Sequence, residues 1–81
     1  MPILTLYGKP GCHLCEGARS AVRGVAARRD VELVEVDVSR DPVLNRRYGE
    51  RIPVLALDGE ELFEYFVDQN ALRERLDKVQ S

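Results

Sequence analysis

Residues 9–15 read Lys-Pro-Gly-Cys-His-Leu-Cys and hold both cysteines of the chain, Cys12 and Cys15. If a helix begins at Cys12, residues three positions apart lie on the same face, so the two sulfurs can meet across its first turn. A reversible disulfide could then form there with little movement of the backbone. The spacing by itself also allows metal binding or a structural cross-link.

Length and composition indicate one small domain over residues 1–81. The chain has 44% hydrophobic and 32% charged residues, and 81 residues are close to the size at which a single core becomes marginal. Tryptophan is missing and only two phenylalanines occur, so we expect a core made mainly of Val, Leu, Ile and Ala.

The charge pattern argues against nucleic acid as a partner. The formal net charge is −2, and the basic residues are spread along the chain. The densest basic pairs, Arg28-Arg29 and Arg46-Arg47, are interpreted as solvated helix ends that complement the helix dipole, with contact to an acidic partner as the alternative.

Targeting signals are also missing from the sequence. No apolar run approaches the roughly 20 residues that span a bilayer, and the amino-terminal residues do not resemble a signal peptide. We therefore expect a cytoplasmic protein with no membrane partner. Two closely spaced cysteines in a reducing compartment favour redox chemistry or metal binding over a static cross-link.

The first half of the chain alternates strand and helix patterns. Residues 1–7 form an apolar run typical of a strand buried on both faces, and residues 31–38 are rich in β-branched residues. Between them, apolar residues recur at helical spacing, which predicts a helix of about four turns beginning at the cysteines. Gly17 and Gly24 weaken such a helix, which indicates close packing at those positions, with the approach of a partner as the alternative.

The second half predicts a short helix, a hairpin and a last helix. Asp41 and Pro42 are typical of a helix start, with a stop at Gly49. A strand over residues 51–57, a tight turn at Asp58-Gly59 and a second arm over residues 60–66 form the hairpin. A final helix capped by Asp68 follows, with Leu72, Leu76 and Val79 as its apolar positions.

The predicted fold class is α/β, in the order β-α-β-α-β-β-α. Strand, helix and strand imply a parallel pair with a right-handed crossover, and the hairpin completes a four-stranded mixed sheet flanked by helices on both faces. We expect the sheet order second, first, third, fourth. Cys12 would then lie at the carboxyl end of a central strand and at a helix amino terminus, where α/β folds generally place their sites.

That position suggests different roles for the two cysteines. The thiolate is the attacking species in disulfide exchange, and the partial positive charge of a helix amino terminus favours the anion of Cys12 over that of the deeper Cys15. We assign Cys12 as the nucleophile and Cys15 as the resolving thiol. Lys9 and His13 are candidates for adding positive charge that tunes the acidity of Cys12, although for His13 we favour the interpretation as a partly exposed first-turn histidine without a catalytic duty.

A metal-binding function is the main alternative. Cys12, Cys15 and His13 offer three ligands at best, whereas a closed zinc site needs four. An iron–sulfur or zinc module, or an adaptor with passive cysteines, remains the second hypothesis, and no bound cofactor or metal is expected under the first.

The whole chain resembles a small glutaredoxin-like protein of the thioredoxin-fold superfamily. The matching features are Tyr7 to Cys15 after the first strand, Ile52-Pro53-Val54 at the third, the hairpin and the last helix. The resemblance implies a dithiol–disulfide oxidoreductase. It also implies a cis peptide bond before Pro53, which would pack against the disulfide, and pairing of the Ile52 backbone with bound substrate like an added strand.

The sequence departs from the family pattern at positions that bear on glutathione binding and on the choice of redox partner. Leu6 stands where thioredoxins carry a buried aspartate, and Glu64 to Asp68 run where glutaredoxins have a Gly-Gly pair and aspartate that hold glutathione. Lys9 is the clearest retained glutathione contact. Small hydrogen donors of ribonucleotide reductase are similar to about the same degree. We therefore expect a monomer that reduces protein or glutathione mixed disulfides, with glutathione or a thioredoxin-reductase-type enzyme as the electron donor.

Overall fold

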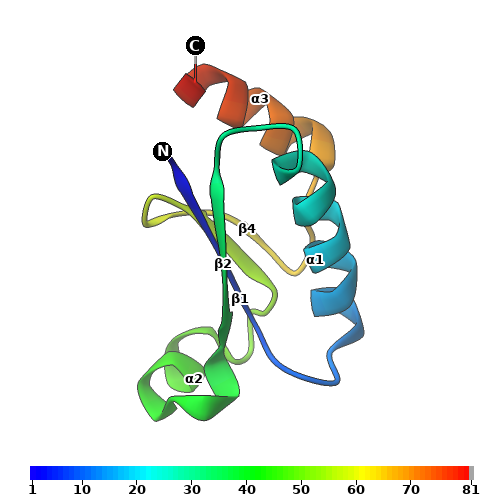
Figure 1. Cartoon of the computed structure of the whole chain (residues 1–81). Coiled ribbons are helices and arrows are strands. Elements are labelled where there is room, and N and C mark those ends of the chain that lie inside the picture. The colour runs from blue at the N-terminus through cyan, green and yellow to red at the C-terminus, as the bar shows by residue number, and fades with distance from the viewer. Residues whose placement is uncertain (81) are drawn as a thin grey trace.

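A computed structural model describes residues 1–80 of the chain, and Figure 1 shows its arrangement. The elements are β1 (Ile3–Gly8), α1 (His13–Ala26), β2 (Glu32–Asp37), the 3-10 helix η1 (Val38–Arg40), α2 (Pro42–Tyr48), β3 (Val54–Leu57), β4 (Glu60–Glu64) and α3 (Gln69–Gln80). The predicted order of strands and helices is confirmed, and η1 is added between β2 and α2. Among the described residues, none of the helices is long and apolar enough to cross a membrane.

The four strands form one mixed sheet in the order β2-β1-β3-β4. β1 pairs with β2 in parallel and with β3 in the antiparallel direction, and β3 and β4 form the hairpin. This is the predicted order, and it places the carboxyl end of the central strand β1 directly before the cysteines.

Helices α1 and α3 lie side by side on one face of the sheet (Figure 1). Between them and the strands lies the main cluster, an aliphatic core in which Leu72 and Leu76 of α3 are fully buried. Its buried members are Leu4, Leu6, Ala18, Val22, Val25, Leu55, Leu57, Val67, Leu72 and Leu76.

Helix α2 lies at the opposite face, near the carboxyl end of β1. Side chains alternate along a strand, so Tyr7 points away from the face that Leu4 and Leu6 occupy. The ring of Tyr48 stacks on Tyr7 with their centroids 4.1 Å apart. This contact belongs to a second group, the site cluster, whose buried members are Cys15, Val38, Tyr48, Ile52 and Val54, with Tyr7, Cys12 and Leu44 packed against them.

The predicted caps and turn take the expected conformations. Asp41 Oδ1 accepts hydrogen bonds from the backbone N–H groups of Val43 and Leu44, which fixes the start of α2. Asp68 Oδ1 accepts in the same way from the first turn of α3. The turn residues Asp58 and Gly59 both have positive φ angles, 49° and 89°, as a type I′ hairpin requires.

Four details of the sequence-based picture are wrong. The third strand begins at Val54 instead of residue 51, because its pairing with β1 starts at the Tyr7–Val54 pair. The expected burial of both faces of β1 fails at Ile3, which is 40% exposed. The hairpin arm ends at Glu64 instead of residue 66, because Tyr65 leaves the extended conformation with φ of 67°. Gly17 and Gly24 are not closely packed, since a methyl group on either would meet nothing within 4 Å.

Candidate active site

Cys12 is the N-cap of α1. Its Sγ accepts a hydrogen bond from the backbone N–H of Cys15 at 3.1 Å, and its carbonyl accepts one from the N–H of Glu16. A sulfur in this position faces the unpaired N–H groups and the positive end of the helix dipole, which stabilise an anion. The prediction that the helix starts at the cysteines is confirmed.

Gly11 makes the turn that brings the chain from β1 to this cap. Its φ is +79°, in the left-handed region that glycine enters without steric cost. A side chain there would meet no neighbouring atom, so the requirement for glycine comes from the backbone alone.

Cys15 is buried beneath Cys12, with only 4% of its surface exposed. Burial raises the pKa of the Cys15 thiol to about 11, and its hydrogen bond with the Cys12 side chain adds to the rise. A backbone hydrogen bond from Lys9 and the charge of Lys9 lower this pKa in part. The two thiols are therefore unequal, because Cys15 keeps its proton well above neutral pH.

Gly8 provides the space for the Cys15 sulfur. A methyl group on Gly8 would lie 3.1 Å from Cys15 Sγ and 3.3 Å from its Cβ, closer than side chains normally pack. Sequence reasoning used Gly8 only as the end of a strand and missed this contact. In the sequence, Gly8 is only a glycine seven residues before Cys15. This spacing does not predict a contact unless the fold is already known.

Ile52 and Pro53 reach the cysteines from the start of β3. Ile52 belongs to the site cluster with Cys12 and Cys15, and Pro53 is fully buried. The Ile52–Pro53 peptide bond is cis, and the Pro53 carbonyl accepts a hydrogen bond from the N–H of Tyr65 at 2.8 Å. Residues far apart in sequence thus meet at one end of the sheet.

Lys9 and His13 have different surroundings. Lys9 is exposed and lines a hollow together with Cys15, beside Glu35 and Asp37 of β2. The His13 side chain is 99% exposed, and its Nδ1 lies 4.0 Å from Glu16 Oε2. The structure thus brings Lys9 next to the buried thiol and leaves His13 in solvent, where any charge on its ring is strongly screened.

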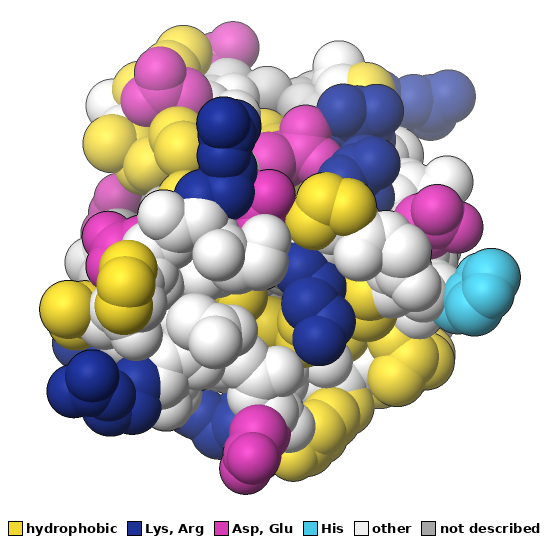
Figure 2. Space-filling model, turned by 90° about the horizontal axis from the view of Figure 1, so that it is seen from below, with side chains coloured by type: hydrophobic (Ala, Val, Ile, Leu, Met, Phe, Trp, Pro, Cys, Tyr) yellow, Lys and Arg dark blue, Asp and Glu magenta, His cyan; other side chains and the backbone are white. Residues whose placement is uncertain are grey.

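A second hollow lies on the other side of the cysteine helix, between α1 and the connection from β4 to α3. Its lining includes the exposed apolar side chains Leu14 and Phe66, which are 59% and 73% accessible. Figure 2 views the molecule from this end and shows apolar side chains beside basic side chains, Lys or Arg. Within residues 1–80, no three His, Cys, Asp or Glu side chains gather as a set of metal ligands.

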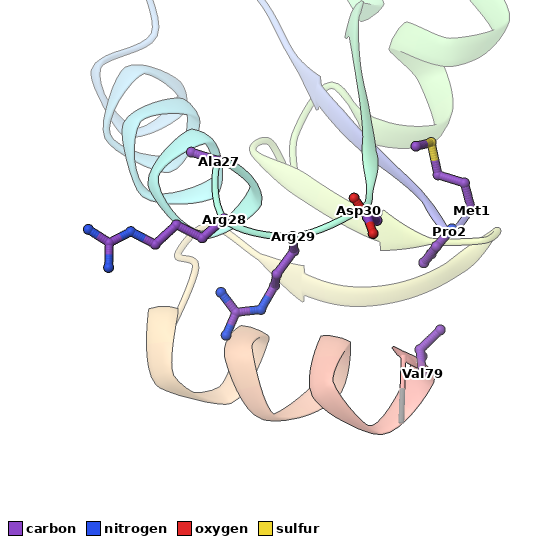
Figure 3. Close-up of a pocket in the computed structure, with 7 residues that line it drawn as sticks. All are labelled: Met1, Pro2, Ala27, Arg28, Arg29, Asp30 and Val79. Atoms are coloured by element: carbon purple, nitrogen blue, oxygen red, sulfur yellow. The ribbon is translucent and has the colours of Figure 1, made fainter.

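A further pocket lies at the opposite end of the molecule (Figure 3). It is formed by the amino terminus, the α1–β2 connection and Val79 of α3. Arg28 points away from the other lining residues, whereas Arg29 turns toward α3, where it pairs with Asp77. None of the residues expected to carry chemistry lies there.

Comparison with known proteins agrees with this architecture. Residues 3–77 match the family model described as Glutaredoxin-like domain (DUF836). The chain belongs to this glutaredoxin-like family. The thioredoxin-like fold and the Cys12-x-x-Cys15 motif together support a redox-type function.

Several solved structures are similar over nearly the whole chain. A structural-genomics target protein from X. campestris is 37% identical, with a TM-score of 0.74 and coverage of 93% of this chain and 96% of that one. Protein Ne2328 from Nitrosomonas europaea is 32% identical, with a TM-score of 0.77 and coverage of 93% and 91%. A mutant thioredoxin from Halobacterium salinarum is 26% identical, with a TM-score of 0.75 and coverage of 99% and 75%.

Among curated sequences, an uncharacterized protein of Mycobacterium tuberculosis is 27% identical over 77 residues. The match covers 89% of this chain and 79% of that protein. The names of the X. campestris, Nitrosomonas and Mycobacterium proteins state no substrate.

Proposed function

We propose that this glutaredoxin-like protein is a thiol–disulfide oxidoreductase in which Cys12 attacks and Cys15 resolves. The observation that carries the proposal is the asymmetry of the two sulfurs. Cys12 Sγ lies at the helix amino terminus and accepts the N–H of Cys15, whereas Cys15 is buried and retains its proton.

In the first step, the Cys12 thiolate attacks one sulfur of a substrate disulfide. A bond forms between Cys12 Sγ and that sulfur, the substrate S–S bond breaks, and the other sulfur leaves as a thiolate that takes a proton from solvent. The position of Cys12 Sγ at the amino terminus of α1, where it accepts the N–H of Cys15, favours this attack because negative charge is stabilised there.

In the second step, Cys15 loses its proton and attacks Cys12 Sγ. The Cys12–Cys15 disulfide forms, and the reduced substrate leaves as its second thiolate. Two electrons have then passed from the protein to the substrate. Proximity within one helical turn makes this intramolecular attack fast despite the small fraction of Cys15 thiolate.

The dithiol must then be regenerated by an external donor. Two molecules of glutathione could reduce the Cys12–Cys15 disulfide and leave as glutathione disulfide, or a thioredoxin-reductase-type enzyme could supply the electrons. We propose protein disulfides or glutathione mixed disulfides as substrates and a monomeric, cytoplasmic protein with no bound cofactor. Lys9 is the candidate contact for the donor or substrate because its side chain is exposed and lines the hollow beside Cys15.

The test is reduction of a disulfide followed through glutathione with its reductase and, separately, through a thioredoxin reductase. Wild type should be active, Cys12→Ser inactive, and Cys15→Ser should accumulate a mixed disulfide with the substrate, visible by mass spectrometry. Ser39→Ala is a control that leaves both thiols in place. Full activity of Cys12→Ser would contradict the assigned roles.

The competing metal-binding function is tested on the same preparation. Protein purified without oxygen is examined for visible absorption and metal content. Stoichiometric metal that is lost in Cys12→Ser and Cys15→Ser, together with no reductase activity, would replace the proposed function by a carrier function.

A further inference from the structure

Residues 50–53 lie in the connection from α2 to β3, and a single residue of the β4–α3 connection, Tyr65, holds this segment on both sides of Ile52. The Tyr65 hydroxyl donates a hydrogen bond to the Glu50 carbonyl at 3.1 Å. The Tyr65 backbone N–H donates to the Pro53 carbonyl at 2.8 Å. Tyr65 thus binds this segment at Glu50, before Ile52, and at Pro53, after it.

Arg51 holds the same connection from the other direction. Its Nη1 lies 2.8 Å from Glu61 Oε1 and 3.2 Å from Glu64 Oε2, both on β4. Its Nε and Nη2 each donate to the Arg47 carbonyl at 3.3 Å, and its Cζ lies 5.3 Å from the centre of the Tyr48 ring. The guanidinium therefore ties the connection to both β4 and α2.

Ile52 sits between these fixed points. Its side chain is buried in the site cluster beside Cys12, and only 8% of the residue is exposed. Within residues 1–80, its backbone N–H and carbonyl take part in no hydrogen bond, whereas the N–H of Arg51 donates to the Tyr48 carbonyl and the Pro53 carbonyl accepts from Tyr65. The family resemblance implies that substrate pairs with the Ile52 backbone, and an unpaired peptide group directly before β3, at the end of the sheet that carries the cysteines, is suited to this pairing with an extended chain.

The conformation of Tyr65 is costly, which makes its two contacts notable. A φ of 67° is a genuine outlier for a bulky residue, and such strain costs about 1–3 kcal/mol. The strained backbone directs its N–H to Pro53 while the ring reaches back to Glu50. Strain of this kind persists where the surrounding contacts hold the residue in place.

We propose that Tyr65 and Arg51 are positioning residues that fix the Ile52 backbone beside Cys12 for pairing with the extended backbone of a polypeptide disulfide. The assignment rests on the proposed function and narrows its substrate class to disulfides carried by a peptide chain. Neither residue touches the reacting sulfurs, so both act through the placement of Ile52. Their effect should vanish for a disulfide that has no peptide groups.

The experiment compares three disulfides with wild type, Tyr65→Phe and Arg51→Gln. The first is a short extended peptide disulfide, the second is the same peptide with its backbone N–H groups next to the cysteine methylated, and the third is bis(2-hydroxyethyl) disulfide. Tyr65→Phe removes only the hydroxyl that holds Glu50. Arg75→Gln is the matched control, because it breaks another arginine–glutamate pair to β4, with Glu60, away from residues 50–53.

Both variants should lower kcat/KM for the plain peptide by about tenfold, mainly through a higher KM, since a misplaced peptide group weakens binding and alignment together. Activity on bis(2-hydroxyethyl) disulfide and on the methylated peptide should stay at the wild-type level, and Arg75→Gln should match wild type throughout. Arg51→Lys should restore part of the loss because it keeps a cation near both glutamates.

Several outcomes would overturn the assignment. Unchanged kcat/KM for the plain peptide in both variants would do so, as would equal losses on all three disulfides, which indicate a merely structural role. A wild-type protein inactive on all three would instead overturn the proposed function. Thermal unfolding of each variant accompanies the assays, and Arg51→Lys provides a folded comparison if Arg51→Gln does not fold.

Discussion

The two hydrophobic clusters of this small protein differ in composition and in the way the chain builds them. The main cluster is aliphatic, has ten buried members, and is made by periodic faces of α1, α3 and the strands. The site cluster has five buried members, among them a thiol and an aromatic ring, and is drawn from separate connections as well as from strands and helices. We infer that the first supplies most of the stability and the second places the sulfurs.

This division explains how a chain of 81 residues can hold a partly exposed Cys12 above a buried Cys15. Burial of apolar surface scales with area, so the larger cluster carries more of the folding free energy. The smaller cluster sets the exposure of Cys12 and the burial of Cys15 instead. Substitutions in the two clusters should therefore affect different measurements.

Leu72→Ala should have the largest effect on stability. Leu72 is fully buried in the main cluster, and truncation of such a leucine costs about 2–5 kcal/mol through lost burial and the cavity left behind. Unfolding in urea measures the loss. Disulfide reduction per folded molecule should remain at the wild-type level, and a folded but inactive variant would contradict the division between the clusters.

The sequence predicts the main cluster well because its signals are local. Leu72 and Leu76 recur at helical spacing, and the Asp58-Gly59 turn fixes the hairpin that brings β3 against β1. The capping side chains at the helix starts bind backbone N–H groups that lie only two or three residues further along the chain. Fold class, strand order and element order follow from such patterns, whatever the details of side-chain packing.

The site is only partly predictable for the opposite reason. Cys12 and Cys15 lie on one helical turn, so their spacing alone marks them as a candidate pair. The fit of Gly8 against Cys15 and the reach of Tyr65 to Glu50 join residues distant in sequence, and they depend on packing that no local pattern encodes. A tyrosine at positive φ even contradicts residue preference, so sequence reasoning extended β4 two residues too far.

The buried thiol should make stability fall at high pH. The pKa of Cys15 is raised to about 11 in the folded protein, so between pH 9 and 11 the unfolded chain has lost a proton that the folded chain keeps. The stability that the protonated thiol provides is complete below this range and is lost as pH rises through it. Two pKa units correspond to at most about 3 kcal/mol.

Urea unfolding of the reduced protein across this pH range measures the effect, with Cys15→Ala as the control. The variant should lose less stability over the same interval, because its site cluster has no thiol to ionise. An identical pH dependence in the two proteins would assign the effect to groups elsewhere and contradict the burial argument.

The two exposed glycines of α1 give the smallest predicted effect and compare the two ends of one helix. Gly24 lies in the half of α1 near the main cluster residue Val25, whereas Gly17 lines the hollow beside Leu14. A methyl group on either meets nothing within 4 Å, so each change to alanine should stabilise the protein by about 0.5–1 kcal/mol through helix propensity. Thermal unfolding checks the gain, and destabilisation at either position would restore the rejected idea of close packing.

Both variants should reduce bis(2-hydroxyethyl) disulfide as wild type does. A loss confined to Gly17→Ala and to the peptide disulfide would extend the substrate-binding surface from Ile52 into this hollow, because only a larger substrate can reach Gly17 while its sulfur reacts at Cys12.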